Sequence, residues 1–237
     1  MATNAEGVTP RETFWQRLAL GLSAVIIFGF AQFALRGFAD PIGAPPWVHL
    51  HGLAMLGWLA LLVVQPSLVL QGRLDLHRRI GWIGAALALL ITGLGIFTGV
   101  MALDLHRFPP FFTPPFFRAL TDAESLVFGA MVLWAIRRRR ATDWHRRLMI
   151  GATVIILEPA LGRILPIPIM GGWAEPVVGL CQLGAVAIVA VHDRRTHGRI
   201  HPATWAVAAV VLVTRLAVSG LAAATPVVAL AYRIVGT

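Results

Sequence analysis

Long apolar segments constrain the fold of this chain more than any other feature. A helix needs about 20 mainly apolar residues to cross a bilayer. Only 13% of the residues are charged, about half the share found in soluble domains. The sequence therefore predicts an all-α, polytopic membrane helix bundle of about seven transmembrane helices, forming a single integral membrane domain over residues 1–237. The expected spans are residues 18–35, 48–70, 80–102, 120–136, 148–165, 176–191 and 203–222.

The first twenty residues are polar, and no small-residue cleavage site follows the first apolar segment before Pro41. We therefore expect residues 1–17 to form a cytoplasmic tail and the first segment to remain as a span. Three later spans are less uniformly apolar, because they contain Glu124, Gln182 and Arg215.

The distribution of arginine predicts the orientation of the bundle. All twenty basic residues are arginine. Most of them lie in the N-terminal tail and in the loops after the second, fourth and sixth spans, which is the positive-inside pattern with a cytoplasmic N-terminus and a periplasmic C-terminus. Arginine in place of lysine, with abundant alanine and glycine, favours a GC-rich bacterial genome and hence the bacterial inner membrane. The net charge of +9 then reflects topology, so we expect a lipid bilayer and no nucleic acid as partner.

Several chemistries are excluded by composition. Without lysine there is no Schiff base for retinal or pyridoxal phosphate and no P-loop. Cys181 is the single cysteine, so neither an intrachain disulfide nor a CxxC metal site can form. A hydrolytic enzyme is the least favoured class, because no Ser-His-Asp set or His-Glu-x-x-His spacing lies on one membrane face.

A short motif occurs twice, and each copy opens an inward-to-outward span. Residues 75–80 and 143–148 both read Asp, apolar, His, Arg, Arg, apolar, and residues 192–195 give a weaker echo. The copies place His77 and His145 at the same membrane depth, where they can act as paired haem ligands. Arg78, Arg79, Arg146 and Arg147 would then be available for the haem propionates. The alternative is that both histidines are only interfacial residues within basic topology anchors.

The second span carries a less apolar stripe that should point inward. His51, Met55, Trp58 and Gln65 lie within about 80° of one another on a helical wheel. His51 is a second candidate cofactor ligand, or else a packing residue at the end of the helix. About one bilayer thickness separates it from His77, so these two cannot share a centre.

Ionisable residues are also expected at membrane depth. Glu158 and Arg215 have matching depths and could form an ion pair, acting either as structural glue or in a proton pathway. Arg163 lies roughly 140° around the helix from Glu158 and is poorly placed to pair with it. The loop at residues 108–117 is rich in phenylalanine and proline. It is expected to be an interfacial lid, with a quinone or lipid-tail entry site as the alternative.

Two stretches carry a resemblance to known families. Residues 47–103 contain H-L-H-G-L-A-M-L-G-W and G-R-L-D-L-H-R-R-I-G-W, and W-H-R-R-L-M-I-G-A-T and E-P-A-L-G-R follow later. They resemble a group of bacterial multi-span membrane proteins of unknown function. More distantly, they resemble the ascorbate-reducible transmembrane cytochrome b family, which implies two b haems held between alternate helices. On that resemblance, His77 and His145 match the inner pair and His51 one outer ligand, while residues 120–136 lack the histidine expected opposite it.

Three functions remain open on these observations. The best specific hypothesis is b-type haem binding and electron transfer through His77 and His145, with haem b as the only cofactor indicated. The alternatives are a proton-coupled transporter, using Glu158, Arg163, Arg215 and the stripe around His51, and a non-catalytic membrane scaffold or sensor. No motif indicates a substrate, a redox partner or an oligomeric state.

Overall fold

The computed structural model describes residues 10–236, and that part of the chain consists of helices joined by loops and turns, without a strand. The elements are α1 (Pro10–Leu35), α2 (Pro46–Leu70), α3 (Leu74–Asp104), α4 (Pro114–Arg137), α5 (Thr142–Ile155), α6 (Glu158–Ile164), α7 (Ile167–Met170), η1 (Gly171–Trp173), α8 (Ala174–His197), α9 (Pro202–Ala223) and α10 (Thr225–Val235). Of the expected N-terminal tail, residues 10–17 belong to α1, and residues 1–9 lie outside the described residues.

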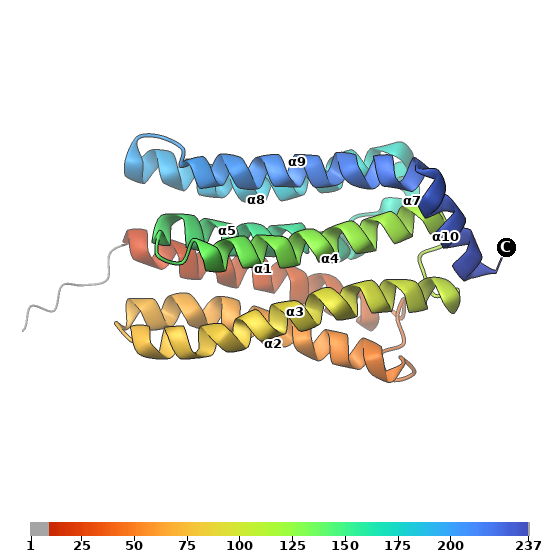
Figure 1. The fold of residues 1–237 in the computed structure, drawn as a ribbon, viewed down its shortest axis with the longest axis horizontal. Helices are drawn as coiled ribbons and strands as arrows, with labels where there is room; N and C mark the ends of the chain where they lie inside the picture. The colour runs from red at the N-terminus through yellow and green to blue at the C-terminus, as the bar shows by residue number, and fades with distance from the viewer. Residues whose placement is uncertain (1–9, 237) are drawn as a thin grey trace, which may run out of the picture.

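The helices run back and forth along one axis, and α10 crosses the end of the bundle (Figure 1). The α4 helix is central, because it packs against α3, α5, α9 and α10. Within residues 10–236, six helical segments are long and apolar enough to cross a membrane. The polytopic helix bundle is therefore confirmed, and the protein is a multi-pass membrane protein.

The fifth span is broken rather than continuous as expected. The α5 helix ends at Ile155, and α6 begins at Glu158. Proline at position 159 has no N–H to donate, and its ring clashes with the carbonyl of the residue four positions earlier, which is Ile155. The Ile155 carbonyl, which Pro159 leaves without its helix donor, accepts a hydrogen bond from the Gln182 side-chain amide of α8 at 3.0 Å. The same amide donates to the Val154 carbonyl at 2.9 Å, which also accepts from the Leu157 N–H.

Small residues hold α3 close to α4. A Cβ atom at Gly95 would lie 2.3 Å from the Ser125 hydroxyl, and one at Gly99 would lie 2.6 Å from the Thr121 hydroxyl. Both glycines therefore face the partner helix directly, and a side chain at either position would force the helices apart.

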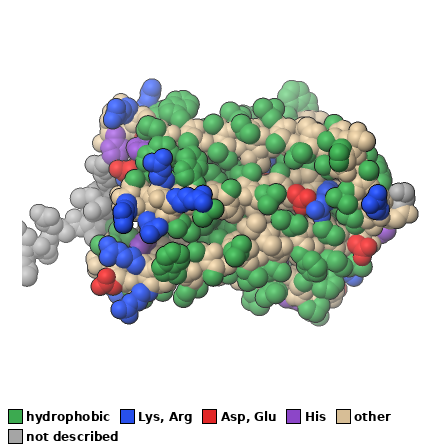
Figure 2. Space-filling view, in the orientation of Figure 1, with side chains coloured by type: hydrophobic (Ala, Val, Ile, Leu, Met, Phe, Trp, Pro, Cys, Tyr) green, Lys and Arg blue, Asp and Glu red, His purple; other side chains and the backbone are tan. Residues whose placement is uncertain are grey.

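The surface divides into two ends and an apolar flank. Arginines gather at the end where α1, α3 and α5 begin, which we call the arginine-rich end, and we call the opposite end the far end (Figure 2). Large apolar side chains on the flank are exposed, as expected where a bundle meets lipid. They include Leu20, Phe28, Leu89, Leu180 and Leu216.

Only some tryptophans near the helix ends are exposed. Trp82, Trp173 and Trp205 are exposed near helix ends, as an interfacial belt requires. Trp15, near the start of α1, is only 5% exposed, because it packs edge-on against His192 with the guanidinium of Arg146 over its ring.

The loop rich in phenylalanine and proline forms an aromatic cluster at the far end. The Phe112 ring centroid lies 4.8 Å from that of Phe111 and 5.1 Å from that of Phe116. Phe112 and Phe116 also pack against a buried cluster of Ala119, Leu120 and Ala123 of α4 with Val218 of α9. Val227 of α10 packs against the same cluster, so residues of the loop, α4, α9 and α10 gather at this end.

Candidate functional site

The two motif histidines face each other at the arginine-rich end. His77 lies in the first turn of α3 and His145 in the first turn of α5, and both helices pack against α4. Their ring centroids are 6.5 Å apart, with the ring planes at 83°. The repeated motif thus brings the imidazoles of two alternate helices together.

Each ring has a nitrogen available to a ligand. The Nδ1 of His145 lies 2.9 Å from the main-chain oxygen of Ala135, so it donates there and leaves Nε2 as an acceptor. The Nδ1 of His77 is buried and has no hydrogen-bond partner in the described chain, while the main chain of Gln65 interacts with the same ring. Metal-binding histidines have this arrangement, because a bond to one nitrogen orients the ring for ligation by the other.

The spacing of the rings suits a shared metal. Two metal–nitrogen bonds of about 2.0 Å on opposite sides of an ion place the imidazole centres roughly 6 Å apart. The observed separation of 6.5 Å is close to this distance. A mononuclear site with three or more ligands is not available, because the described residues contain no group of three His, Cys, Asp or Glu side chains that could hold a metal.

The arginine-rich end offers only some of the arginines expected for haem propionates. Arg79 and Arg73 line an open depression of about 420 Å³ where α2 turns into α3. Arg78 is 73% exposed and lies 3.9 Å from Asp75. Arg146 pairs with Asp143. Three motif arginines therefore reach the surface of this end or its edge.

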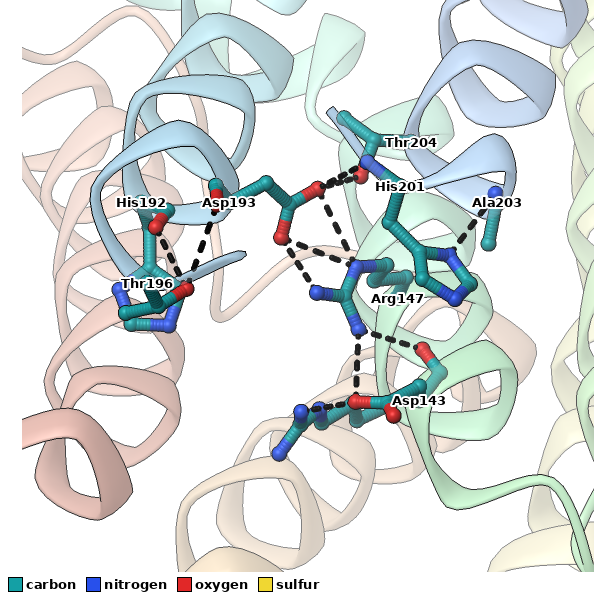
Figure 3. A network of polar contacts seen from close by, with 9 residues as sticks. Asp143, Arg147, His192, Asp193, Thr196, His201, Ala203 and Thr204 are labelled. Carbon is teal, nitrogen blue, oxygen red and sulfur yellow. Dashed lines mark hydrogen bonds and ion pairs between the residues drawn. The ribbon is translucent and has the colours of Figure 1, made fainter. Parts of the chain in front are cut away.

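Arg147 was expected to be available as well, and this is wrong. Its side chain is 1% exposed and holds α5 to α8 (Figure 3). The Nε donates to Asp193 at 3.2 Å, and Nη1 donates to the Asp143 carboxylate at 3.2 Å. Asp193 also accepts from the Thr204 hydroxyl at 2.5 Å and from the main-chain N–H of His201 at 3.1 Å.

The pKa values of Asp143 and His201 are shifted within this network. Burial raises the pKa of the Asp143 carboxyl, but Arg146 and Arg147 outweigh burial and bring that pKa below its ordinary value. Burial lowers the pKa of the His201 imidazole, whose Nδ1 caps α9 by accepting from Ala203 N–H at 3.1 Å. The motif echo at residues 192–195 contains Asp193, although its sequence did not reveal the partnership with Arg147.

His51 lies at the far end, apart from the other two candidate ligands. The stripe is directed inward as expected: Trp58 is 2% exposed, and its indole N–H donates to Thr153 at 3.2 Å. The Nδ1 of His51 is buried without a hydrogen-bond partner among the described residues. The His51 ring lies beside Gly95, which faces Ser125 of α4. The serine hydroxyl therefore lies near the position where a second haem would need a histidine from α4.

A second group of ionisable residues lies toward the far end, inside the bundle. Arg215 of α9 pairs with Glu124 of α4, and its Nη1 donates to Glu175 of α8 at 3.1 Å. The expected ion pair between Glu158 and Arg215 is therefore wrong in its partner, because the terminal nitrogens of Arg215 contact Glu124 and Glu175 instead. Glu158 is 5% exposed and makes no ion pair or hydrogen bond with the described residues, although Arg215 is near enough to influence it electrostatically.

Arg163 is directed toward α1 instead of toward the carboxylates. Its guanidinium donates to the Pro159 carbonyl at 2.6 Å and lies 4.2 Å from the centroid of the Phe30 ring. The expectation that it does not pair with Glu158 agrees with this geometry. Gln32 of α1 donates to the main-chain oxygen of Arg163 at 2.7 Å and fixes the end of α6.

Comparison of the chain with known proteins finds no matching family model, no matching curated protein and no matching solved structure.

Proposed function

We propose that this membrane protein transfers electrons through one b-type haem held between His77 and His145. The observation that carries the proposal is the meeting of the two imidazoles across the bundle, with ring centroids 6.5 Å apart. The buried and unpartnered Nδ1 of His77 adds support, because an orphaned ring nitrogen inside a bundle costs free energy that a metal bond would offset.

The residues around the pair have distinct tasks in this proposal. His77 and His145 would hold the haem iron through their ring nitrogens, and the haem would supply reversible one-electron transfer. The Ala135 carbonyl holds the His145 ring by its Nδ1–H and keeps Nε2 directed away from α4. Arg73 and Arg79, in the depression beside α3, would neutralise the propionate carboxylates of the haem.

The proposed location follows from the charge distribution. The arginine-rich end would face the cytoplasm in a bacterial inner membrane, because arginine is retained on the cytoplasmic side. The haem would then lie near the cytoplasmic surface, where a soluble redox partner can approach it.

The absorption spectrum of the purified full-length protein, expressed in haem-replete cells, tests this function. We expect a reduced-minus-oxidised spectrum of b type that is lost in His77→Ala and in His145→Ala. His49→Ala is the matched control, because His49 is exposed on α2 and lies away from the pair. His51→Ala should also keep the spectrum, since a single haem is held at the other end.

Two results would refute the proposal. A colourless wild-type protein from haem-replete cells excludes a resident haem. A spectrum that survives both His77→Ala and His145→Ala, in protein that elutes as a folded species from size-exclusion chromatography, places the haem elsewhere.

A further inference from the structure

Three carboxylates converge on one arginine inside the bundle, at the break in the fifth span. Glu124 comes from α4, Glu158 from α6 and Glu175 from α8, and they surround Arg215 of α9. We call these four residues the carboxylate cluster. It lies toward the far end, and the haem proposal uses none of its members.

The carboxylate cluster has three acids and one arginine, and only two of the acids form an ion pair with that arginine. Arg215 gives Nη2 to Glu124 and Nη1 to Glu175, and its Nε is buried without a partner among the described residues, so none of its nitrogens bonds to Glu158. Arg163, the other nearby cation, is held against Pro159 and Phe30. Glu158 is therefore a buried carboxyl without a donor, and it lies near two other carboxylates.

A buried carboxylate without a partner is costly in its ionised form. Transfer of an isolated charge out of water costs several kcal/mol even after the protein relaxes. Ionisable groups at membrane depth are for this reason paired or neutral. Glu158 has no ion pair or hydrogen bond within the described chain, and a bound proton would remove its charge.

The local backbone gives independent support for a site. Glu158 follows directly on the break between α5 and α6, and irregular backbone inside a membrane bundle is found where a protein keeps a binding site or a polar cavity. Gln182 is 1% exposed and caps the broken end of α5 with its amide N–H groups, while its Oε1 is buried without a partner. The region thus contains two buried side-chain groups with unused acceptor oxygens.

Exposure within the cluster increases toward the far end. The Glu175 side chain is 27% exposed, that of Glu124 is 6% exposed, and the Glu158 residue is 5% exposed. The charged groups facing Glu158 are those of α4, α8 and α9 in the cluster, together with Arg163 on its own helix. The α1 helix, which also packs on α6, contributes the uncharged Gln32 at this level.

We infer that Glu158 is a proton-binding residue inside the membrane, neutral in the resting protein, which exchanges its proton with the far end through Glu175. When the proton leaves as H⁺, the carboxylate that remains is compensated by Arg215, which is released from Glu124 or Glu175. The ligand is the proton itself, and the step needs no other reactant.

Infrared spectroscopy of the full chain in lipid vesicles tests this inference. The carbonyl stretch of a protonated carboxylic acid is separate from the bands of a carboxylate, and it shifts in D₂O. We expect such a band at neutral pH in the wild-type protein, its loss in Glu158→Gln, and its retention at a shifted frequency in Glu158→Asp. Glu175→Gln is the matched control, because it should keep the band but slow its exchange in D₂O.

Each outcome bears on the assignment. A wild-type protein without the band at neutral pH overturns it, and so does a band that survives Glu158→Gln or disappears in Glu124→Gln alone. Unchanged exchange in Glu175→Gln overturns the route through that residue. If Glu158→Gln cannot be purified, the band position in Glu158→Asp decides, because only a proton on residue 158 makes it move.

Discussion

Removal of the Asp193 carboxylate should destabilise the bundle strongly. Asp193 is fully buried and accepts from Arg147, from the Thr204 hydroxyl and from the His201 main chain. It thereby connects α5 to α8 and α9 at the arginine-rich end. The substitution Asp193→Ala deletes all of these bonds and leaves the guanidinium of Arg147 buried.

The magnitude follows from what is left without a partner. Breaking a buried ion pair by removing one member costs about 3–5 kcal/mol, because the other charge stays desolvated. The Thr204 hydroxyl and the His201 N–H also lose their acceptor, which adds to the cost. Asp143 and its main-chain oxygen still bind Nη1 of Arg147 and limit the loss. We expect a decrease of about 4 kcal/mol in the free energy of unfolding, a large part of the 5–15 kcal/mol typical of a domain.

Reversible unfolding in mixed detergent micelles, followed by tryptophan fluorescence, measures this change. The matched control is Asp75→Ala in the first copy of the motif, because Asp75 is 91% exposed and should not matter. The double substitution Arg147→Met with Asp193→Leu should cost far less than Asp193→Ala alone, because it removes both charges. Equal stability of Asp193→Ala and Asp75→Ala would refute the reasoning, as would a double variant no more stable than Asp193→Ala.

Three further predictions concern packing, the helix break and pH. Gly99→Ala should cost about 1–3 kcal/mol by pushing against Thr121, whereas Gly93→Ala on the same helix has open space and should not destabilise; thermal unfolding in detergent compares them. Gln182→Leu should cost about 1–3 kcal/mol, because the buried Ile155 carbonyl loses its donor while the Val154 carbonyl keeps only the Leu157 N–H, and restored stability on addition of Pro159→Ala would confirm that cause. The pKa of the His201 imidazole lies below its ordinary value, so the contribution of this residue to stability is complete above about pH 6.5 and decreases as the pH falls further. His201→Asn keeps an uncharged cap on α9 and should weaken this pH dependence of stability. An unchanged pH profile of stability in that variant would contradict the prediction.

Features with a strong local cause were predictable from sequence. Spans follow from apolar length, and α2 and α9 begin and end within a few residues of the predicted limits. The depth of His77 and His145 followed from the repeated motif, because equivalent positions in parallel helices lie at one level. Their approach to 6.5 Å agrees with that reasoning.

Features that depend on the choice of neighbouring helix were not predictable. The partner of Arg215 was wrong, because matching depth along the membrane does not determine which helix faces which. Glu124 was visible in the sequence, but only the packing of α4 against α9 brings it to Arg215. The break before Glu158 did have a local signal in Pro159, since proline removes a helix hydrogen bond.

The two copies of the motif have nearly the same sequence but different neighbours, so a comparison of their residues shows which features depend on the surroundings. Arg79 and Arg147 occupy the same motif position, yet one lines an open depression and the other is 1% exposed. The start of α5 is enclosed by α1, α4, α8 and α9, while α3 packs mainly against α2 and α4, so an arginine in the second copy needs a buried acid and finds Asp193. The histidines behave differently, because both are directed across the bundle from helices that share the neighbour α4. A purely interfacial anchor would not require the two rings to meet, whereas the haem that we propose requires it.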